Sequence, residues 1–126
     1  MHKSKLAGFI IDCESTDLGG AARFWGGALG MKVEALPGGE GQTYARLRDP
    51  AEALHIEVQT VDHPSRVHLD IETDDIEAEV QRLEALGATR VRQVQTWFVM
   101  QAPTGQRFCV VSASSPAFAT TATIWP

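Results

Sequence analysis

The sequence predicts an α+β fold built from two βαβββ modules. Segments in which apolar and polar residues alternate indicate strands, and two segments with apolar residues three and four positions apart indicate helices. The order strand, helix and three strands occurs twice along the 126 residues. One helix and four strands bury too little of their own sheet, so we expect the two modules to pair.

An internal repeat supports this prediction directly. A shift of 58 residues aligns three acidic pairs, which are Asp12 with Asp70, Glu14 with Glu72 and Asp17 with Asp75. The predicted helix ends, Leu29-Gly30 and Leu86-Gly87, align at a shift of 57 residues. We therefore expect one domain over residues 6–112, with modules at 6–60 and 65–112 and a tail at 113–126.

The first module begins with a predicted strand at residues 6–14, in which Phe9, Ile11 and Cys13 share the face toward the helix. A helix over 18–29 follows, with Asp17 among the residues that start it and Gly30 as its stop. A glycine-rich turn is expected at 37–41. Alternating patterns predict strands at residues 32–36, 42–48 and 54–60.

The second module repeats this order. Its first strand, at 66–73, places Val67, Leu69 and Ile71 opposite His68. Asp74 is expected to cap a helix whose apolar stripe runs from Ile76 to Leu86, with Gly87 as its end. Further strands are predicted at residues 89–95, 97–101 and 107–111. The tail is interpreted as an extended arm with Trp125 near its end.

Composition excludes several classes of function. Eleven basic and 16 acidic residues give a net charge of −5, which argues against a nucleic-acid partner. No apolar run is long enough to span a membrane. Two cysteines, Cys13 and Cys109, are too few for a disulfide framework, so we expect a cytoplasmic protein. Exposed edges of the paired sheets favour a homodimer.

Two stretches carry a family resemblance: Asp17-Leu18 through Arg23-Phe24-Trp25 to Leu29-Gly30, and Arg66-Val67-His68-Leu69-Asp70-Ile71 with Pro103-Thr104-Gly105-Gln106-Arg107-Phe108-Cys109. They are similar to the vicinal oxygen chelate superfamily (glyoxalase, bleomycin resistance and extradiol dioxygenase), and in particular to its glyoxalase-like domains. The resemblance implies curled mixed sheets around a shared cleft. In metal-dependent members that cleft holds one divalent ion, bound mainly by His and Glu from the first and last strands of each module.

The family's usual ligand set is incomplete in this sequence. His68 occupies a ligand position, but its partner in the first module is Ile10, and Cys109 stands where a Glu is usual. For the remaining position Glu57 fits by spacing and Gln59 by likeness to the subgroup. We therefore predict no tightly bound metal, although a divalent ion, if present, would use His68, Glu57 and Cys109.

Other roles for these residues stay open. His68 and Glu57 are the candidate catalytic residues; each also has a structural interpretation, as a paired histidine and as an edge charge. Candidates for substrate binding are Gln59, His55, Asp70, Trp97 and Cys109. Cys109 also suits the role of a small buried apolar residue.

Two functions of different classes follow. The first is a protein that binds, and as an enzyme transforms, a small oxygenated molecule by lyase or isomerase chemistry. The alternative is a metal-free binding protein that sequesters a drug or other small molecule, as bleomycin-resistance members do. An acidic surface would suit a cationic ligand. A pterin-related role is a third hypothesis, because similar domains occur beside pterin dehydratases.

Overall fold

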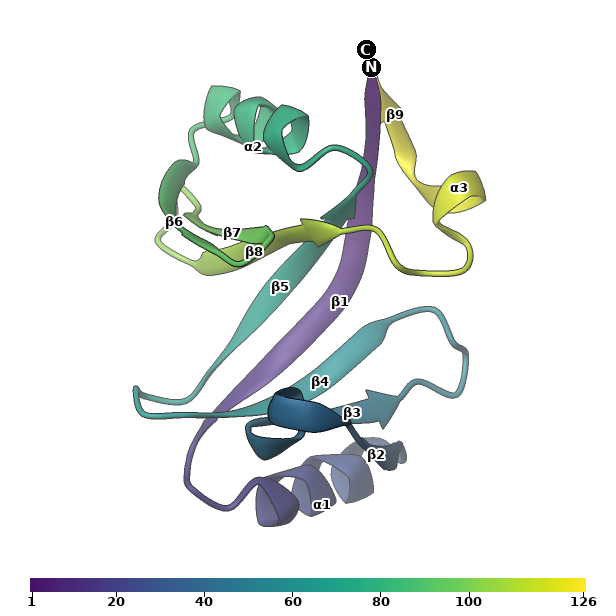
Figure 1. The fold of residues 1–126 in the computed structure, drawn as a ribbon, viewed down its shortest axis with the longest axis vertical. Helices are drawn as coiled ribbons and strands as arrows, with labels where there is room; N and C mark the ends of the chain where they lie inside the picture. Colours follow the sequence, from purple (N-terminus) through teal and green to yellow (C-terminus); the bar gives the residue numbers. More distant parts are fainter. The chain divides into compact units, whose positions relative to one another are not determined.

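The computed structural model describes all residues 1–126, which form nine strands, three α-helices and one 3₁₀ helix. The strands are β1 (His2–Glu14), β2 (Lys32–Ala35), β3 (Tyr44–Arg48), β4 (His55–Val61), β5 (Arg66–Thr73), β6 (Thr89–Val94), β7 (Trp97–Gln101), β8 (Arg107–Ser112) and β9 (Thr123–Trp125). The helices are α1 (Leu18–Leu29), α2 (Ile76–Ala85) and α3 (Phe118–Thr121), with the 3₁₀ helix η1 at Gly38–Gln42 (Figure 1). The predicted α+β class and the two βαβββ modules are confirmed.

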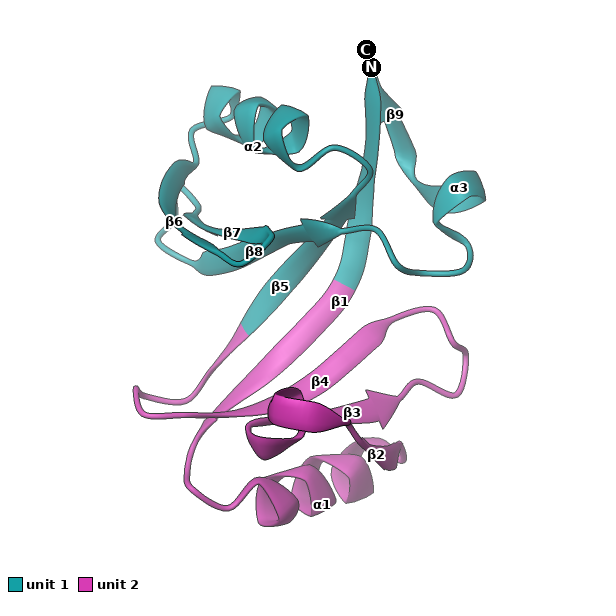
Figure 2. Ribbon diagram, in the orientation of Figure 1, with its two compact units in different colours: residues 1–7, 68–126 teal, residues 8–67 magenta.

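The chain divides into two compact units (Figure 2). Unit 1 contains Met1–Ala7 and His68–Pro126, and unit 2 contains Gly8–Val67. Strand β1 therefore contributes its first residues to unit 1 and its remaining residues to unit 2.

In unit 2 the strand order is β2-β3-β4-β1. Strands β1 and β4 are parallel, whereas β3 is antiparallel to both β2 and β4. Helix α1 packs on one face, where Ile11, Leu47, Ile56 and Val58 form the buried core. Cys13 and Trp25 pack against this core, as their places in the apolar patterns predict.

The ends of α1 follow its sequence signals. The Asp17 side chain accepts a hydrogen bond from the Gly20 amide at 3.0 Å, which satisfies one donor of the first turn. At the other end Gly30 adopts the left-handed conformation, with φ of 68°. Glycine reaches this conformation without steric cost, so the helix ends where the sequence predicts.

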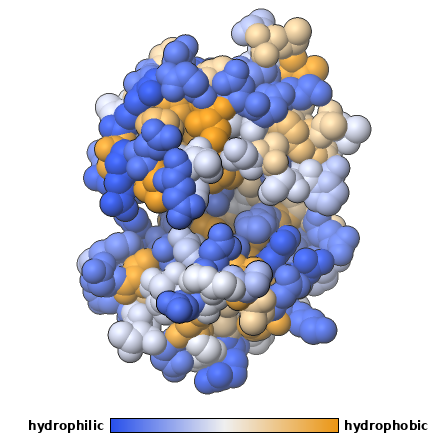
Figure 3. All heavy atoms as spheres, viewed as in Figure 1, coloured by the Kyte–Doolittle hydropathy of each residue, from blue (hydrophilic) through white to orange (hydrophobic).

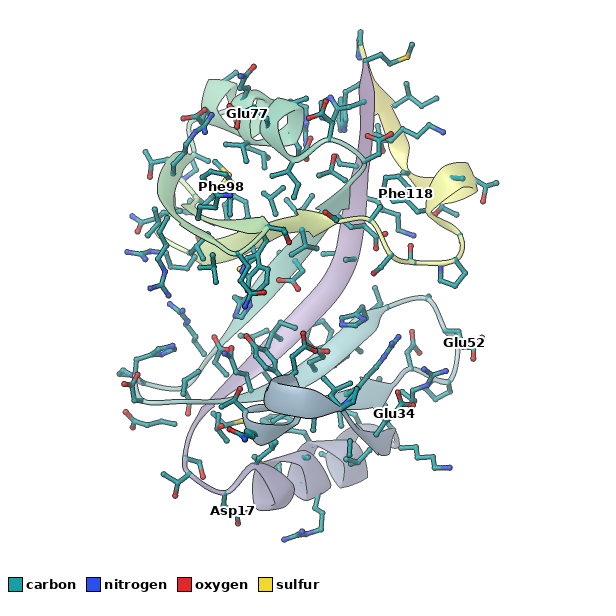
Figure 4. The ribbon with its side chains drawn as sticks, in the orientation of Figure 1. Asp17, Glu34, Glu52, Glu77, Phe98 and Phe118 are labelled. Carbon is teal, nitrogen blue, oxygen red and sulfur yellow. The ribbon has the colours of Figure 1, made fainter.

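In unit 1 the corresponding order is β5-β8-β7-β6, again with one parallel pair, β5 and β8. Strand β7 is antiparallel to β6 and β8. Helix α2 packs on one face over a core of Val80, Leu83, Ala88, Met100 and Val110. Phe98, labelled in Figure 4, packs against this core from β7.

The termini meet within unit 1, which the sequence does not predict. The start of β1 pairs antiparallel with β9, so β1 begins at His2 rather than at residue 6. The tail is not simply extended, because it contains α3 as well as β9. A strand without a partner leaves its backbone donors unsatisfied, so pairing with the tail extends β1.

Three other predicted details were wrong. Asp75, not Asp74, caps α2, and its side chain accepts from the Ala78 amide at 3.0 Å. Leu86 lies beyond the helix and is 67% exposed rather than part of the apolar stripe. The turn at 37–41 is the short helix η1.

The visible surface in Figure 3 is largely hydrophilic, with smaller hydrophobic areas between the polar side chains. No helix of this chain combines the length and the apolar composition needed to cross a membrane.

Candidate functional site

The unit 1 sheet presents one apolar and one polar face. Ile71, Phe98 and Val110 face α2 and belong to or pack against the core. Because successive side chains of a strand alternate between faces, the residues beside them lie on the face opposite α2. We call this the polar face of unit 1. It carries His68 and Asp70 on β5, Cys109 on β8 and Trp97 on β7.

Three of these residues form a cluster. His68 Nε2 lies 3.6 Å from Asp70 Oδ1, and these two side chains are only 12% and 14% exposed. The parallel pairing of β5 and β8 places Cys109 directly opposite Asp70. One nitrogen, one oxygen and one sulfur atom from the three side chains all lie within 4.8 Å of one another. We refer to these residues as the His68 cluster.

The cluster combines groups suited to proton transfer. Imidazole can accept or donate a proton near neutral pH. A neighbouring carboxylate orients the ring and stabilises the positive charge that develops when the ring accepts a proton. Burial of both side chains strengthens this electrostatic interaction relative to water. The arrangement can therefore hold a polar ligand and exchange a proton with it.

The same donor set fits a divalent metal ion. Imidazole nitrogen, carboxylate oxygen and thiolate sulfur are all ligands of zinc and similar ions. Three protein ligands are the usual number in a catalytic site, since the fourth position is left for substrate. The sequence predicted His68, Glu57 and Cys109 as the ligands of an ion, if one were bound. The structure instead groups His68 and Cys109 with Asp70, which was expected to bind substrate.

Unit 2 holds the other predicted residues. His55 Nε2 lies 3.2 Å from Glu57 Oε2 on β4. Ile10, opposite Glu57 in the parallel pairing, is 3% exposed and offers no metal ligand. Gln59 lies opposite Asp12 in the register of β4 and β1.

The strand registers relate Gln59 to Cys109. Asp12 aligns with Gln59 in the first module, and Asp70 aligns with Cys109 in the second. Since Asp12 and Asp70 correspond in the internal repeat, Gln59 rather than Glu57 is the structural counterpart of Cys109. The structure thus brings His68, Asp70 and Cys109 together in unit 1 and pairs His55 with Glu57 in unit 2.

The sequence analysis did not single out Arg46, a half-buried residue of β3. Its alternation with Ala45 and Leu47 nevertheless places it on the polar side of that strand.

Comparisons with known proteins agree with this architecture. The family model described as a glyoxalase-like domain matches residues 8–111. A search of the curated proteins found no match to this sequence.

Solved structures with a similar fold include a hypothetical protein, BH1468, from Bacillus halodurans C-125. It has a TM-score of 0.65 and 15% identity, over 88% of this chain and 96% of that chain. Methylmalonyl-CoA epimerase from Mycobacterium tuberculosis gives 0.58 and 19% identity, over 89% and 90% of the two chains.

A Streptomyces coelicolor methylmalonyl-CoA epimerase variant, in complex with 2-nitronate-propionyl-CoA, gives a TM-score of 0.58 and 17% identity over 88% and 96% of the two chains. At these identities the likeness establishes the fold. The family model spans most of the chain, and both predicted modules are present. The chain therefore belongs to the glyoxalase-like domain family of the vicinal oxygen chelate superfamily.

Proposed function

We propose that the protein binds a small oxygenated molecule at the His68 cluster and catalyses an isomerase-type proton transfer on it. The observation that carries this proposal is the half-buried pair of His68 and Asp70, 3.6 Å apart and beside Cys109. An imidazole beside a carboxylate is suited to act as a general acid and base.

In this mechanism His68 accepts a proton from a carbon atom beside a carbonyl group and later returns it. Asp70, 3.6 Å from the ring, stabilises its charged form, and Cys109 borders the ligand on β8. A divalent ion held by His68, Asp70 and Cys109 would instead supply a Lewis acid for a carbonyl oxygen of the substrate, and the imidazole would then be a ligand rather than the base. Carbon acids activated by carbonyl groups are the substrate class that such an arrangement favours.

Because the fold is similar to that of methylmalonyl-CoA epimerases, we choose methylmalonyl-CoA as the first probe. One such structure contains methylmalonyl-CoA itself. In deuterated water, a proton removed by His68 is replaced by deuterium. We expect the protein to catalyse incorporation of deuterium at the α-carbon of methylmalonyl-CoA or a related acyl thioester, as followed by mass spectrometry.

The variants His68→Ala and His68→Gln should reduce this exchange at least about a hundredfold, because general acid–base catalysis contributes about that much. His63→Ala is the matched control, since His63 lies in the β4–β5 loop and contacts the Pro64 carbonyl. Exchange by His68→Ala at the rate of the unmodified protein would contradict the proposed mechanism.

The alternative is a binding protein without catalysis. It is favoured by Ile10, whose buried aliphatic side chain occupies the position that corresponds to His68 in the internal repeat. This function predicts that acyl thioesters or other small oxygenated molecules bind in calorimetry, that His68→Ala weakens binding, and that no deuterium is incorporated.

A further inference from the structure

We propose that Arg46 on β3 is the centre of a carboxylate-binding site in unit 2. The Nε atom of Arg46 is buried and has no hydrogen-bond partner. A guanidinium group is charged at all physiological pH values and carries five N–H donors. Burying this N–H donor without a partner costs free energy, which an anionic ligand with paired oxygen atoms would recover.

The neighbouring carboxylates do not satisfy Arg46. In the sheet Arg46 lies opposite Glu34 on β2 and opposite Glu57 on β4. Glu34 is directed to a different arginine, with Oε2 3.7 Å from Arg48 Nη1. Glu57 pairs instead with His55 at 3.2 Å. Figure 4 labels Glu34 beside this part of unit 2. Both carboxylates that flank Arg46 thus pair with other side chains.

The next pair along the same face adds a neutral donor. Tyr44 on β3 lies opposite Gln59 on β4, two residues from the pair of Arg46 and Glu57. Side chains two residues apart on one strand lie on the same face, at a separation of about 7 Å. The carboxamide of Gln59 can donate hydrogen bonds. This donor beside Arg46 therefore favours the carboxylate of a small organic acid.

This site is independent of the proposed function of His68. It also differs from the expectation drawn from net charge, because a protein with a charge of −5 was expected to suit a cationic ligand. Local geometry, rather than net charge, favours an anionic ligand here, because a planar guanidinium recognises a carboxylate through two parallel hydrogen bonds.

The experiment is a titration of the full chain with malonate, followed by nuclear magnetic resonance of the arginine Nε–H groups. Since Arg46 Nε has no acceptor in the free protein, malonate should shift the Arg46 signal strongly. Malonamide, which has the same shape without charge, should not. The variants Arg46→Gln and Arg46→Lys should weaken malonate binding about tenfold or more in calorimetry.

Arg23→Gln is the matched control, because Arg23 lies on the exposed surface of α1 and its loss should leave binding unchanged. His63→Ala, a change in the β4–β5 loop outside both proposed sites, should also bind malonate normally. An Arg46 signal that does not respond to malonate would overturn the proposal without requiring any variant to fold. The proposal would also be overturned if both Arg46 variants bound malonate as tightly as the unmodified protein does. An equally large response to inorganic phosphate would overturn the assignment to carboxylates.

Discussion

At the scale of single residues, the two cysteines show how position decides chemistry. Cys13 packs against the apolar core of unit 2, whereas Cys109 lies beside His68 and Asp70. Only Cys109 has neighbours of the kind that bind metal ions. Two thiols of the same chain are therefore expected to behave differently toward metals and toward alkylating reagents.

Cobalt distinguishes the two thiols. Added Co²⁺ should bind reversibly at the His68 cluster and produce the near-ultraviolet absorption of a thiolate–cobalt bond. Cys109→Ser should abolish this absorption, while Cys13→Ser, the matched control, should retain it. Asp70→Asn should weaken cobalt binding by removing the third donor. If the absorption survives in Cys109→Ser, the cluster is not the metal site.

Alkylation tests the surroundings of Cys13. Burial raises the pKa of the Cys13 thiol above its ordinary value of 9.0, and a hydrogen bond with Trp25 opposes this only in part. A raised pKa means less thiolate at any given pH, and the thiolate is the reactive form. In the Cys109→Ser variant at about pH 8, iodoacetamide should therefore modify Cys13 several-fold more slowly in folded protein than in urea-unfolded protein. Equal rates, measured by mass spectrometry, would show that the folded structure does not protect the thiol.

At the scale of elements, the parallel pairs β1/β4 and β5/β8 determine which side chains become neighbours. Each pair joins the first and last strands of its module. The close approach of β1 and β4 depends on Gly8, since a Cβ atom at this position would lie 1.8 Å from the His55 carbonyl oxygen. The register that aligns Asp12 with Gln59 therefore requires the absence of a side chain at residue 8.

Gly8→Ala should destabilise the protein by about 2 kcal/mol or more, because the backbone of β4 must move to relieve the contact. Gly27→Ala is the matched control. An added Cβ there meets no atom within 4 Å, and alanine favours a helix interior by up to about 1 kcal/mol. The urea concentration at the midpoint of unfolding should therefore fall for Gly8→Ala and rise for Gly27→Ala. A Gly8→Ala variant as stable as the unmodified chain would show that β1 and β4 adapt without cost.

At the scale of the whole molecule, a network of side chains holds both termini to α2. His2 Nε2 lies 2.8 Å from Glu79 Oε1, and Arg82 donates two hydrogen bonds of 2.8 Å to the same carboxylate. The Arg82 guanidinium lies 3.8 Å from the ring centroid of Trp125 on β9. Trp125 in turn donates to Ser4 at 2.8 Å. The first and last strands are thereby fixed to unit 1.

This network predicts the response to acid. Burial by itself would raise the pKa of Glu79, but hydrogen bonds from Arg82 and His2 outweigh burial and lower it below the ordinary value of 4.5. The folded state therefore binds the proton less tightly than the unfolded state does. The stabilisation is present above about pH 4.5 and is lost as the pH falls through the lower pKa of the folded protein.

Glu79→Gln should remove this part of the pH dependence, as measured by urea unfolding between pH 3 and about 7. The variant should also be less stable at neutral pH, because the Arg82 guanidinium loses its charged partner. Glu77→Gln is the comparison variant: Glu77, labelled in Figure 4, is an exposed residue of the same helix whose pKa is also lowered by Arg90, and its substitution should change the pH dependence of stability less because solvent screens an exposed pair. If the free energy of unfolding of Glu79→Gln depends on pH in acid as it does in the unmodified protein, the role assigned to the network is refuted.

The sequence by itself determined the two βαβββ modules, the ends of α1 and the apolar side of each sheet. These features depend on periodicity and on caps, which involve residues close together in the chain. The repeat of Asp12 at Asp70 also relates the two modules from the sequence alone. His68 was predicted as a candidate site residue from the family resemblance and from its place on the polar side of a strand.

Only the tertiary structure decided which distant residues meet. Asp70 joins Cys109 because β5 and β8 pair in one particular register, and no local pattern specifies a register between strands more than 30 residues apart. The pairing of β9 with β1 has the same origin. So does the position of Arg46 between two carboxylates that pair with other side chains. Local residue patterns set the elements, whereas long-range strand pairing set the chemistry of their faces.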